Sequence, residues 1–563
     1  MGVLCGSGVY AATVDTGSIY RAIQKSGHRD SVKKAHPKYK TKEEHHALMT
    51  SADTTLIKEF KIVGNDEFSK SELNLLLEPF IGKVLTSGKI TEAANILTEY
   101  FHTKGYFTEE TSLRKDSIQE GIVTLVVEER HLEKNGISVQ NKGKRVKSKI
   151  VQKLWDSTMK AGAMKQDDYE RAMLLTNDLP GISAKSDMYF GQEAMTDDLI
   201  ITVTDEKIFN GNIDIDNYGS YGTGETEVGT TLYWNSPTGN GEEIVARLIT
   251  SGQYSNYGYI DVALPVLNNA TRFGISLDYL DYENKHDAKG EGTAWNGNVY
   301  LKYPFVRSEV FTLEGEARYV HAVLKDNNAT EQIDHTKIDK GVFKILGNRS
   351  DTFLLNGITY FDLSLTVGDV DLKNSENKQM DAMLYNTDGD FAKLNFSLSR
   401  YQNLVGDLSV KLSFDGQFAS KNLDSSEKYS LGGPYAVTAY PVGEAAGDNA
   451  WVLGVEFNYD FYSMPWGGDF QLSAFYNYGW TELLKNPKKY LDYYSIDSKY
   501  NEIRLQTVGV GFSQTWTDSV VIRGMIGKQI GDNEYRDIPG NDHKDIDQSD
   551  SNYRAWIEAI YYF

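Results

Sequence analysis

In the stretch WVLGVEFNYDF, residues 451–461, large apolar side chains recur at every second position. Successive side chains of a β-strand point to opposite faces, so one face would carry Trp451, Leu453, Val455, Phe457, Tyr459 and Phe461. The other face would carry Gly454, Glu456, Asn458 and Asp460. The same period occurs in RFGISLDYL (272–280) and in the final YRAWIEAIYYF (553–563). This pattern predicts strands with one apolar and one polar face.

Roughly sixteen segments of this kind fill residues 207–563, joined by connections that are alternately short and long. Asn268-Asn269 is a short connection, and KNPKKYLDYYSIDSK (485–499) is a long one. A water-soluble sandwich also alternates, but the length and regularity of this series favour a membrane barrel. We therefore predict a mainly β chain that contains a 16-stranded antiparallel transmembrane β-barrel, closed so that no strand edge meets lipid.

Composition agrees with a chain of strands and turns. The 563 residues include 50 Gly, 36 Tyr and 23 Phe but only 11 Pro. A formal net charge of -21 argues against nucleic acid as a partner, because phosphate binding needs a basic surface. No run of apolar residues is long enough for a transmembrane helix, and mean hydropathy is -0.45. A membrane barrel can still have a low mean hydropathy, because apolar and polar residues alternate along each of its strands.

Residues 56–131 and 132–206 each have the order strand, helix, helix, strand. In the first unit Ser69 is a candidate N-cap and Gly105 a candidate helix end. Two copies of one order predict two α+β domains of the same fold, placed before the barrel.

Three further segments precede these units. Residues 1–12 resemble the remnant of a signal peptide, with Tyr10-Ala11-Ala12 as the cleavage site, although a disordered N-terminus is the alternative. We expect a short helix within residues 13–30 and a polar linker over residues 31–55. Cys5 is the single cysteine, so the chain has no internal disulfide.

The segment SLGGPYAVTAYPVGEAAGD, residues 430–448, is rich in glycine yet too apolar for an ordinary solvent loop. It lies between the predicted eleventh strand, DLSVKLSFDGQFA (407–419), and the twelfth, which begins at Trp451. Residues 421–448 are therefore predicted to form a long connection between these two strands.

The chain resembles the outer-membrane transporters of two-partner secretion, the TpsB-type haemolysin or haemagglutinin secretion and activation proteins. These belong to a superfamily of POTRA domains joined to a barrel. The resemblance covers nearly the whole chain. It is carried by Gly64-Asn65, Pro79–Lys83 and Lys104-Gly105-Tyr106, by MLLTNDLPGI (173–182) and DNYGSYGTGE (216–225), and by the loop. It implies two periplasmic POTRA domains, 56–131 and 132–206, and a plug helix at 13–30. It also implies that the loop, residues 421–448, folds back into the barrel.

The resemblance also implies site residues. In the loop the matching motif comprises Gly432, Gly433, Pro434, Val437, Thr438, Ala439, Tyr440, Gly443 and Glu444. On strand thirteen it comprises Phe475, Asn477 and Gly479, all facing inward. The family has an arginine at the position of Thr438, a glycine at that of Ala439 and an aspartate at that of Asn477. In the family this arginine and this aspartate form an ion pair. Here both are replaced by neutral side chains, Thr438 and Asn477.

Thr438 and Asn477 can share a hydrogen bond worth about 1 kcal/mol, which predicts a weaker docking of the loop. The alternatives are that docking uses other contacts or that the loop moves more freely.

The function implied by the resemblance is export of an unfolded haemolysin- or haemagglutinin-like adhesin without ATP. No phosphate-binding loop occurs in the sequence. Expected partners are this secreted protein, outer-membrane lipid and the barrel-assembly machinery, with Phe563 as the C-terminal assembly signal. The alternative is an insertase of the same superfamily.

An enzyme is not expected, since no Gly-x-Ser-x-Gly motif occurs. The histidines of the barrel region form no recognisable catalytic arrangement, and we interpret them as scattered loop residues. They are His286, His321, His335 and His543. EEHHAL (43–48) lacks further metal ligands, so we expect no metal and no cofactor.

Overall fold

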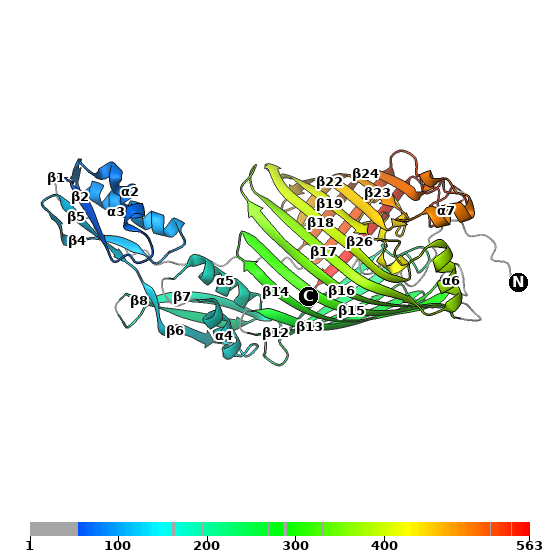
Figure 1. Cartoon of the computed structure of the whole chain (residues 1–563), viewed down its shortest axis with the longest axis horizontal. Coiled ribbons are helices and arrows are strands. Elements are labelled where there is room, and N and C mark those ends of the chain that lie inside the picture. Colours follow the sequence, from blue (N-terminus) through cyan, green and yellow to red (C-terminus); the bar gives the residue numbers. More distant parts are fainter. Residues whose placement is uncertain are drawn as a thin grey trace.

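The computed structural model describes residues 54–563, except 160–163, 194, 268–269, 285, 287–289, 328–331, 518 and 542. A large barrel is joined to two small α+β units at one of its ends (Figure 1). We call the opposite end of the barrel the outer end. The predicted signal-peptide remnant (1–12), plug helix (13–30) and nearly all of the linker (31–55) lie outside the described residues.

The first unit contains two packed helices and a three-stranded sheet of order β2-β5-β4. Ser69 caps the first helix as predicted, since its side chain accepts a hydrogen bond from the amide of Glu72. The predicted strand order was incomplete: β4 pairs antiparallel with β5, and its polar sequence conceals the period. The elements are β1 (Thr54–Leu56), β2 (Glu59–Val63), α2 (Lys70–Leu77), η1 (Glu78–Phe80), β3 (Val84–Thr86), α3 (Ser87–Thr103), β4 (Glu110–Gln119) and β5 (Ile122–Glu128).

The second unit repeats this topology with sheet order β6-β8-β7. In both sheets the central strand runs parallel to the first strand and antiparallel to the other. The indole N–H of Trp155 donates to the hydroxyl of Thr176 at 2.9 Å and joins the two helices. The elements are β6 (His131–Asn141), α4 (Ser148–Thr158), α5 (Gln166–Asn177), β7 (Ile182–Phe190) and β8 (Thr196–Asp205).

The second unit contacts the near end of the barrel directly. The guanidinium of Arg307 makes two hydrogen bonds to the carboxylate of Asp178, at 2.8 and 3.0 Å. Arg171 donates to the carbonyl of Pro304 at 2.5 Å. These polar contacts join the unit to the last residues of β14.

The barrel is closed and has sixteen antiparallel strands, which confirms the predicted fold. The ladder between β26 and β9 completes the circle. The strands are β9 (Phe209–Asp216), β10 (Glu227–Asn235), β11 (Glu243–Thr250), β12 (Ser255–Val266), β13 (Thr271–Glu283), β14 (Glu291–Arg307), β15 (Phe311–Asn327), β16 (Gln332–Asp351), β17 (Gly357–Leu372), β18 (Gly389–Val405), β19 (Leu408–Ala419), β22 (Asn449–Phe461), β23 (Asp469–Glu482), β24 (Glu502–Trp516), β25 (Val520–Gln529) and β26 (Tyr553–Tyr562).

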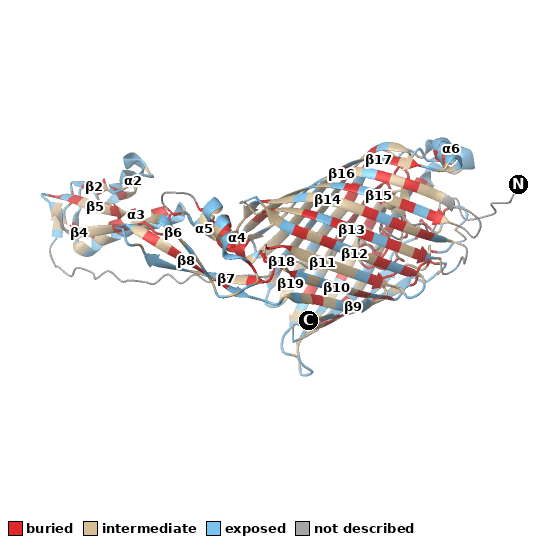
Figure 2. Ribbon diagram, turned by 90° about the horizontal axis from the view of Figure 1, so that it is seen from below, coloured by how far each residue is buried: buried red, intermediate tan, exposed pale blue. Residues whose placement is uncertain are grey.

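The apolar faces of the strands point outward. On β13, Ile275 and Leu277 are 47% and 46% exposed, whereas Ser276 and Asp278 are 1% and 4% exposed. This alternation recurs around the wall as rows of exposed and buried residues (Figure 2). Such a surface suits hydrocarbon, because the backbone polar groups are paired within the closed sheet. None of the helices in the described part of the chain is long and apolar enough to cross a membrane.

Two short helices lie at the outer end of the barrel, α6 (Ser375–Leu384) and α7 (Lys488–Tyr494) (Figure 1). The rings of Tyr385 and Tyr490 pack with centroids 5.3 Å apart, so the two helices support each other. The 3-10 helix η3 (Ser498–Asn501) follows α7 and leads into β24.

Candidate functional site

The chain between β19 and β22, residues 420–448, is folded back against the inside of the barrel wall, and we call it the lumen loop. It contains η2 (Ser425–Glu427), β20 (Tyr429–Ser430) and β21 (Ala446–Gly447), and its position between the eleventh and twelfth strands agrees with the prediction. Leu431, Val437 and Tyr440 have no exposed surface and pack with wall residues that include Ile503 and Leu505. The loop therefore has an apolar core of its own.

Glycines close the loop into a compact turn. The amide of Gly432 donates to the carbonyl of Glu444 at 3.1 Å, and that of Gly433 donates to the carbonyl of Tyr440 at 3.0 Å. A Cβ on Gly432 would lie 2.1 Å from the carbonyl oxygen of Pro441, and Gly433 has a φ of +117°. Larger residues would not fit here. Gly443 also has positive φ, and Pro434 is buried directly after Gly433.

The structure contains the contact between Thr438 and Asn477. The hydroxyl of Thr438 donates to the side-chain oxygen of Asn477 at 3.0 Å. Gly479 lies beside the same part of the loop, since a Cβ there would be 2.7 Å from Val437. Phe475 covers Gly509 of the neighbouring strand. The motif residues of β23 thus all face inward, as the alternation predicts.

Other contacts hold the centre of the loop on three more strands. The indole N–H of Trp556 on β26 donates to the carbonyl of Thr438 at 2.7 Å. The amide of Ala439 donates to the hydroxyl of Thr507 on β24 at 3.1 Å, and Gln529 on β25 donates to the Ala439 carbonyl at 3.3 Å. Docking therefore uses other contacts besides the hydrogen bond between Thr438 and Asn477, as the first alternative expects.

The sequence offered one signal for these contacts. In the final strand Trp556 shares the inward face with Arg554 and Glu558, and a tryptophan on a polar face needs a partner for its N–H. Thr507 on β24 and Gln529 on β25 lie in sequences that gave no comparable indication of a partner.

Buried charges hold both ends of the lumen loop. Asp448, whose side chain has no exposed surface, accepts from the amides of Leu423 and Lys485 at 3.1 and 2.8 Å. It also pairs with the ammonium of Lys428 at 2.8 Å. Glu427 lies between two wall lysines and pairs with Lys393 at 2.9 Å and with Lys340. Sequence patterns did not identify these residues as partners.

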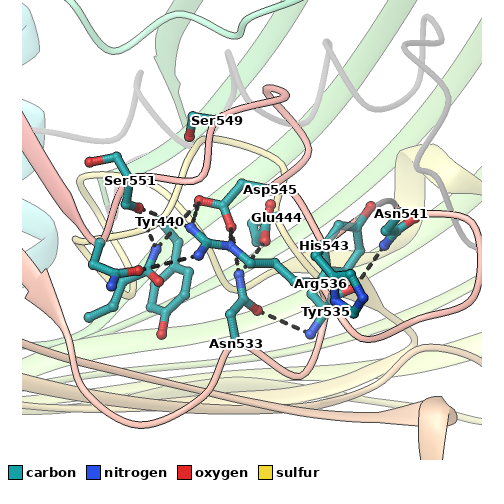
Figure 3. A network of polar contacts seen from close by, with 12 residues as sticks. Tyr440, Glu444, Asn533, Tyr535, Arg536, Asn541, His543, Asp545, Ser549 and Ser551 are labelled. Carbon is teal, nitrogen blue, oxygen red and sulfur yellow. Dashed lines mark hydrogen bonds and ion pairs between the residues drawn. The ribbon is translucent and has the colours of Figure 1, made fainter.

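A second loop covers the lumen loop. Residues 530–552, between β25 and β26, contribute a polar network around Glu444 (Figure 3). The carboxylate of Glu444 accepts from the side-chain amide of Asn533 at 2.9 Å and from the amide of Ile546 at 2.8 Å. Burial, and then the neighbouring Asp545, raises the pKa of Glu444 well above its ordinary value. The motif glutamate is thus held by a loop that sequence analysis did not single out.

Phe563 lies at the seam of the barrel. Its amide donates to the carbonyl of Gly211 on β9 at 3.0 Å, next to the last strand pairs between β26 and β9. Its ring lies near Tyr561, with centroids 6.4 Å apart.

Four histidines of the barrel region are dispersed. His321 and His335 lie in β15 and β16, which corrects their interpretation as loop residues. His321 pairs with Asp339 at 2.8 Å, and His286 stacks on Tyr221. Within the described residues, no group of three or more His, Cys, Asp or Glu side chains is arranged to hold a metal ion.

Comparison with known proteins identifies the architecture. Residues 196–498 match the family model of the haemolysin secretion/activation protein ShlB/FhaC/HecB, and residues 55–129 match the ShlB-type POTRA domain. The heme/hemopexin transporter protein HuxB of Haemophilus influenzae (strain 86-028NP) is 26% identical over 503 residues, covering 88% of this chain and 85% of HuxB. The outer membrane transporter CdiB of Escherichia coli O6:K15:H31 (strain 536 / UPEC) is 21% identical over 486 residues, covering 80% of this chain and 77% of CdiB.

A solved structure, CdiB from Escherichia coli, shares the fold with a TM-score of 0.73 at 16% identity, covering 97% of this chain and 98% of that chain. The family model matches more than half of the chain, so the predicted resemblance is confirmed. The barrel lies in the outer membrane, and the POTRA domain lies in the periplasm. The chain belongs to the haemolysin secretion/activation family ShlB/FhaC/HecB, the TpsB-type transporters of two-partner secretion.

Proposed function

We propose that this transporter moves an unfolded protein of the haemolysin or haemagglutinin-like adhesin class to the cell surface without ATP. The observation that carries the proposal is the lumen loop, whose centre is hydrogen-bonded to the inner faces of four consecutive strands. A closed barrel with a docked internal element is suited to a gated conduit. The relatives named above are a heme/hemopexin transporter and an outer membrane transporter.

Capture of the exported protein would occur at the sheet edges of the α+β units. We assign residues 132–206 as a second POTRA domain because its strand order matches that of the first. Its edge strand β7 exposes Tyr189 by 54% and Phe190 by 71%. An extended chain could pair with such an edge through its backbone and place apolar side chains on these rings.

Two further partners concern the barrel itself. Its exposed apolar wall suits outer-membrane lipid, and Phe563 is proposed as the signal read by the barrel-assembly machinery. The seam position of Phe563 supports this assignment, because the final strand must pair with β9 to close the sheet.

Deletion of the transporter is expected to abolish surface appearance of an adhesin encoded at a neighbouring locus. The exported protein should instead remain in the periplasm, where proteases reach the unfolded chain. Surface labelling and fractionation measure both outcomes, and re-expression of the transporter is the control. Reconstitution in vesicles without nucleotide tests the independence from ATP. Unchanged export after deletion would reject the proposal.

Thr438→Arg alone is expected to impair export more than Thr438→Arg combined with Asn477→Asp. Thr438 is 4% exposed, so a lone guanidinium would be a buried charge without a partner, at a cost of about 3–5 kcal/mol. Aspartate at position 477, where Asn477 now contacts Thr438, would supply the partner. Export per assembled barrel is the measurement, with Asn477→Asp alone as the control. Equal defects in the single and double variants would rule out this pairing.

A further inference from the structure

The β25–β26 loop, residues 530–552, completes the apolar core of the lumen loop. Tyr535 and Ile538 are 3% and 2% exposed and belong to the same buried cluster as Val437 and Tyr440 of the lumen loop. Ile546 packs against this cluster from the side. Removal of the lumen loop from the wall would therefore separate two loops that share one core.

Polar contacts cross the same boundary (Figure 3). The side-chain amide of Asn533 donates to Glu444 at 2.9 Å and to Asp545 at 2.7 Å, so one group bridges two carboxylates. Gln529 reaches both Asp545, at 3.4 Å, and the carbonyl of Ala439, at 3.3 Å. Asp545 is thus connected to the lumen loop along two routes.

Arg536 supplies the positive charge of this network. Its guanidinium makes two hydrogen bonds to the Asp545 carboxylate, at 2.5 and 3.0 Å. The Asp545 side chain has no exposed surface, and Glu444 is also wholly buried. Without Arg536 this buried site would contain two neighbouring carboxyl groups and no positive charge to offset the repulsion when both are ionised. The other nearby guanidinium, that of Arg554, pairs with Asp547.

We propose that the β25–β26 loop is the latch of the lumen loop in this chain, with Arg536 as a positioning residue that acts through Asp545 and Asn533 on Glu444. The family has an arginine at the position of Thr438. In this chain Arg536 of the β25–β26 loop would supply the guanidinium instead. The latch would have to open before export, and that part of the proposal rests on the proposed function. The docking itself is measurable without any exported protein.

A buried reporter tests the latch in the full-length protein. Val437 has no exposed surface, so Val437→Cys in a Cys5→Ser background should react with a maleimide only when the lumen loop leaves the wall. Arg536→Met is expected to increase the labelling rate at least about tenfold, because it leaves the buried carboxylate of Asp545 without its positively charged partner. Arg536→Lys, which keeps the charge, should restore part of the protection.

Two controls locate the effect. Arg349 is exposed and pairs on β16 with Phe311, at the barrel end far from both loops, so Arg349→Met should leave labelling unchanged. Asn477→Ala removes the contact to Thr438 and should raise labelling less than Arg536→Met does. If Arg536→Met fails to assemble, Asn533→Leu breaks the bridge without exposing a charge and should also raise labelling. Labelling of the latch variants no faster than the parent, or slower than Asn477→Ala, would overturn the proposal.

The pH profile separates a charge effect from simple loss of packing. The groups that face Glu444 are Asp545, Asp547 and Arg536 of the β25–β26 loop and Tyr440 of the lumen loop. Relative to a solvent-exposed cysteine at the same pH, labelling of Arg536→Met should slow as the pH falls, because protonation removes the repulsion between the carboxyl groups. A relative labelling rate of Arg536→Met that does not change with pH would contradict the role given to its charge.

Discussion

Asp448→Ala is expected to free both ends of the lumen loop and to increase labelling of the Val437→Cys reporter roughly a hundredfold or more. The buried carboxylate accepts two backbone hydrogen bonds, from Leu423 and Lys485, and pairs with Lys428. Alanine would leave an ammonium group and two amide groups without this acceptor in a site where the Asp448 side chain has no exposed surface. Loss of one partner of a buried pair costs about 3–5 kcal/mol.

The matched control is Asp492→Ala, since Asp492 is an exposed carboxylate on α7 of the adjacent outer loop. It should label at the rate of the parent. Far-UV circular dichroism should show an intact barrel for both variants, because Asp448 lies just before β22 rather than within the wall. A labelling rate of Asp448→Ala within twofold of the control would show that this carboxylate does not hold the loop.

Glu427→Gln is expected to destabilise the docked loop by about 3–5 kcal/mol, because it leaves the ammonium groups of Lys340 and Lys393 without their anion. The Glu427 side chain is only 3% exposed, so solvent screens these charges little. The labelling rate of the same reporter measures the effect. Glu376→Gln on α6, at an exposed position, is the control and should not alter the rate.

Glu427 also predicts an acid-sensitive loop. Burial by itself raises the pKa of Glu427, but Lys340 and Lys393 outweigh it and lower the pKa from 4.5 to about 2. A lowered carboxyl pKa stabilises the docked state above pH 4.5, and this contribution of about 3 kcal/mol is lost as the pH falls toward 2. Accessibility of the reporter in the parent, measured with 4,4′-dithiodipyridine because that reagent reacts with thiols in acid, should therefore rise as the pH falls between these values. Glu427→Gln should lack this part of the profile, and an identical rise in both proteins would contradict the assignment.

The strands of the barrel could be predicted because their signal is local. Each strand in hydrocarbon must present apolar groups outward, and residues such as Ile275 and Leu277 repeat that requirement every second position. β4 was missed for the converse reason. It is an edge strand of a small sheet, and its sequence ETSLRKDSIQ has few apolar residues to reveal a period.

The partners of the lumen loop could not be predicted in the same way. Asn533 contacts Glu444 across 89 positions of the chain, and Trp556 contacts Thr438 across 118. Helix and strand periodicities span only a few residues, so they could not indicate either of these contacts. The resemblance identified Glu444 and Thr438 as motif residues, but it supplied a partner on the wall only for Thr438.

By itself, the sequence determined the strands of the barrel, since periodicity and turn residues act over a few positions, and its resemblance to the family indicated the inserted loop. Only the tertiary structure decided how that loop is held. Closure of the barrel brings β26 beside β9 and places Trp556, Gln529 and Arg536 around a loop that leaves the wall at β19. Thr438 and Asn477 share a neutral hydrogen bond, and the charged groups near them, Arg536 and Asp545, lie on a segment that only folding brings to this site.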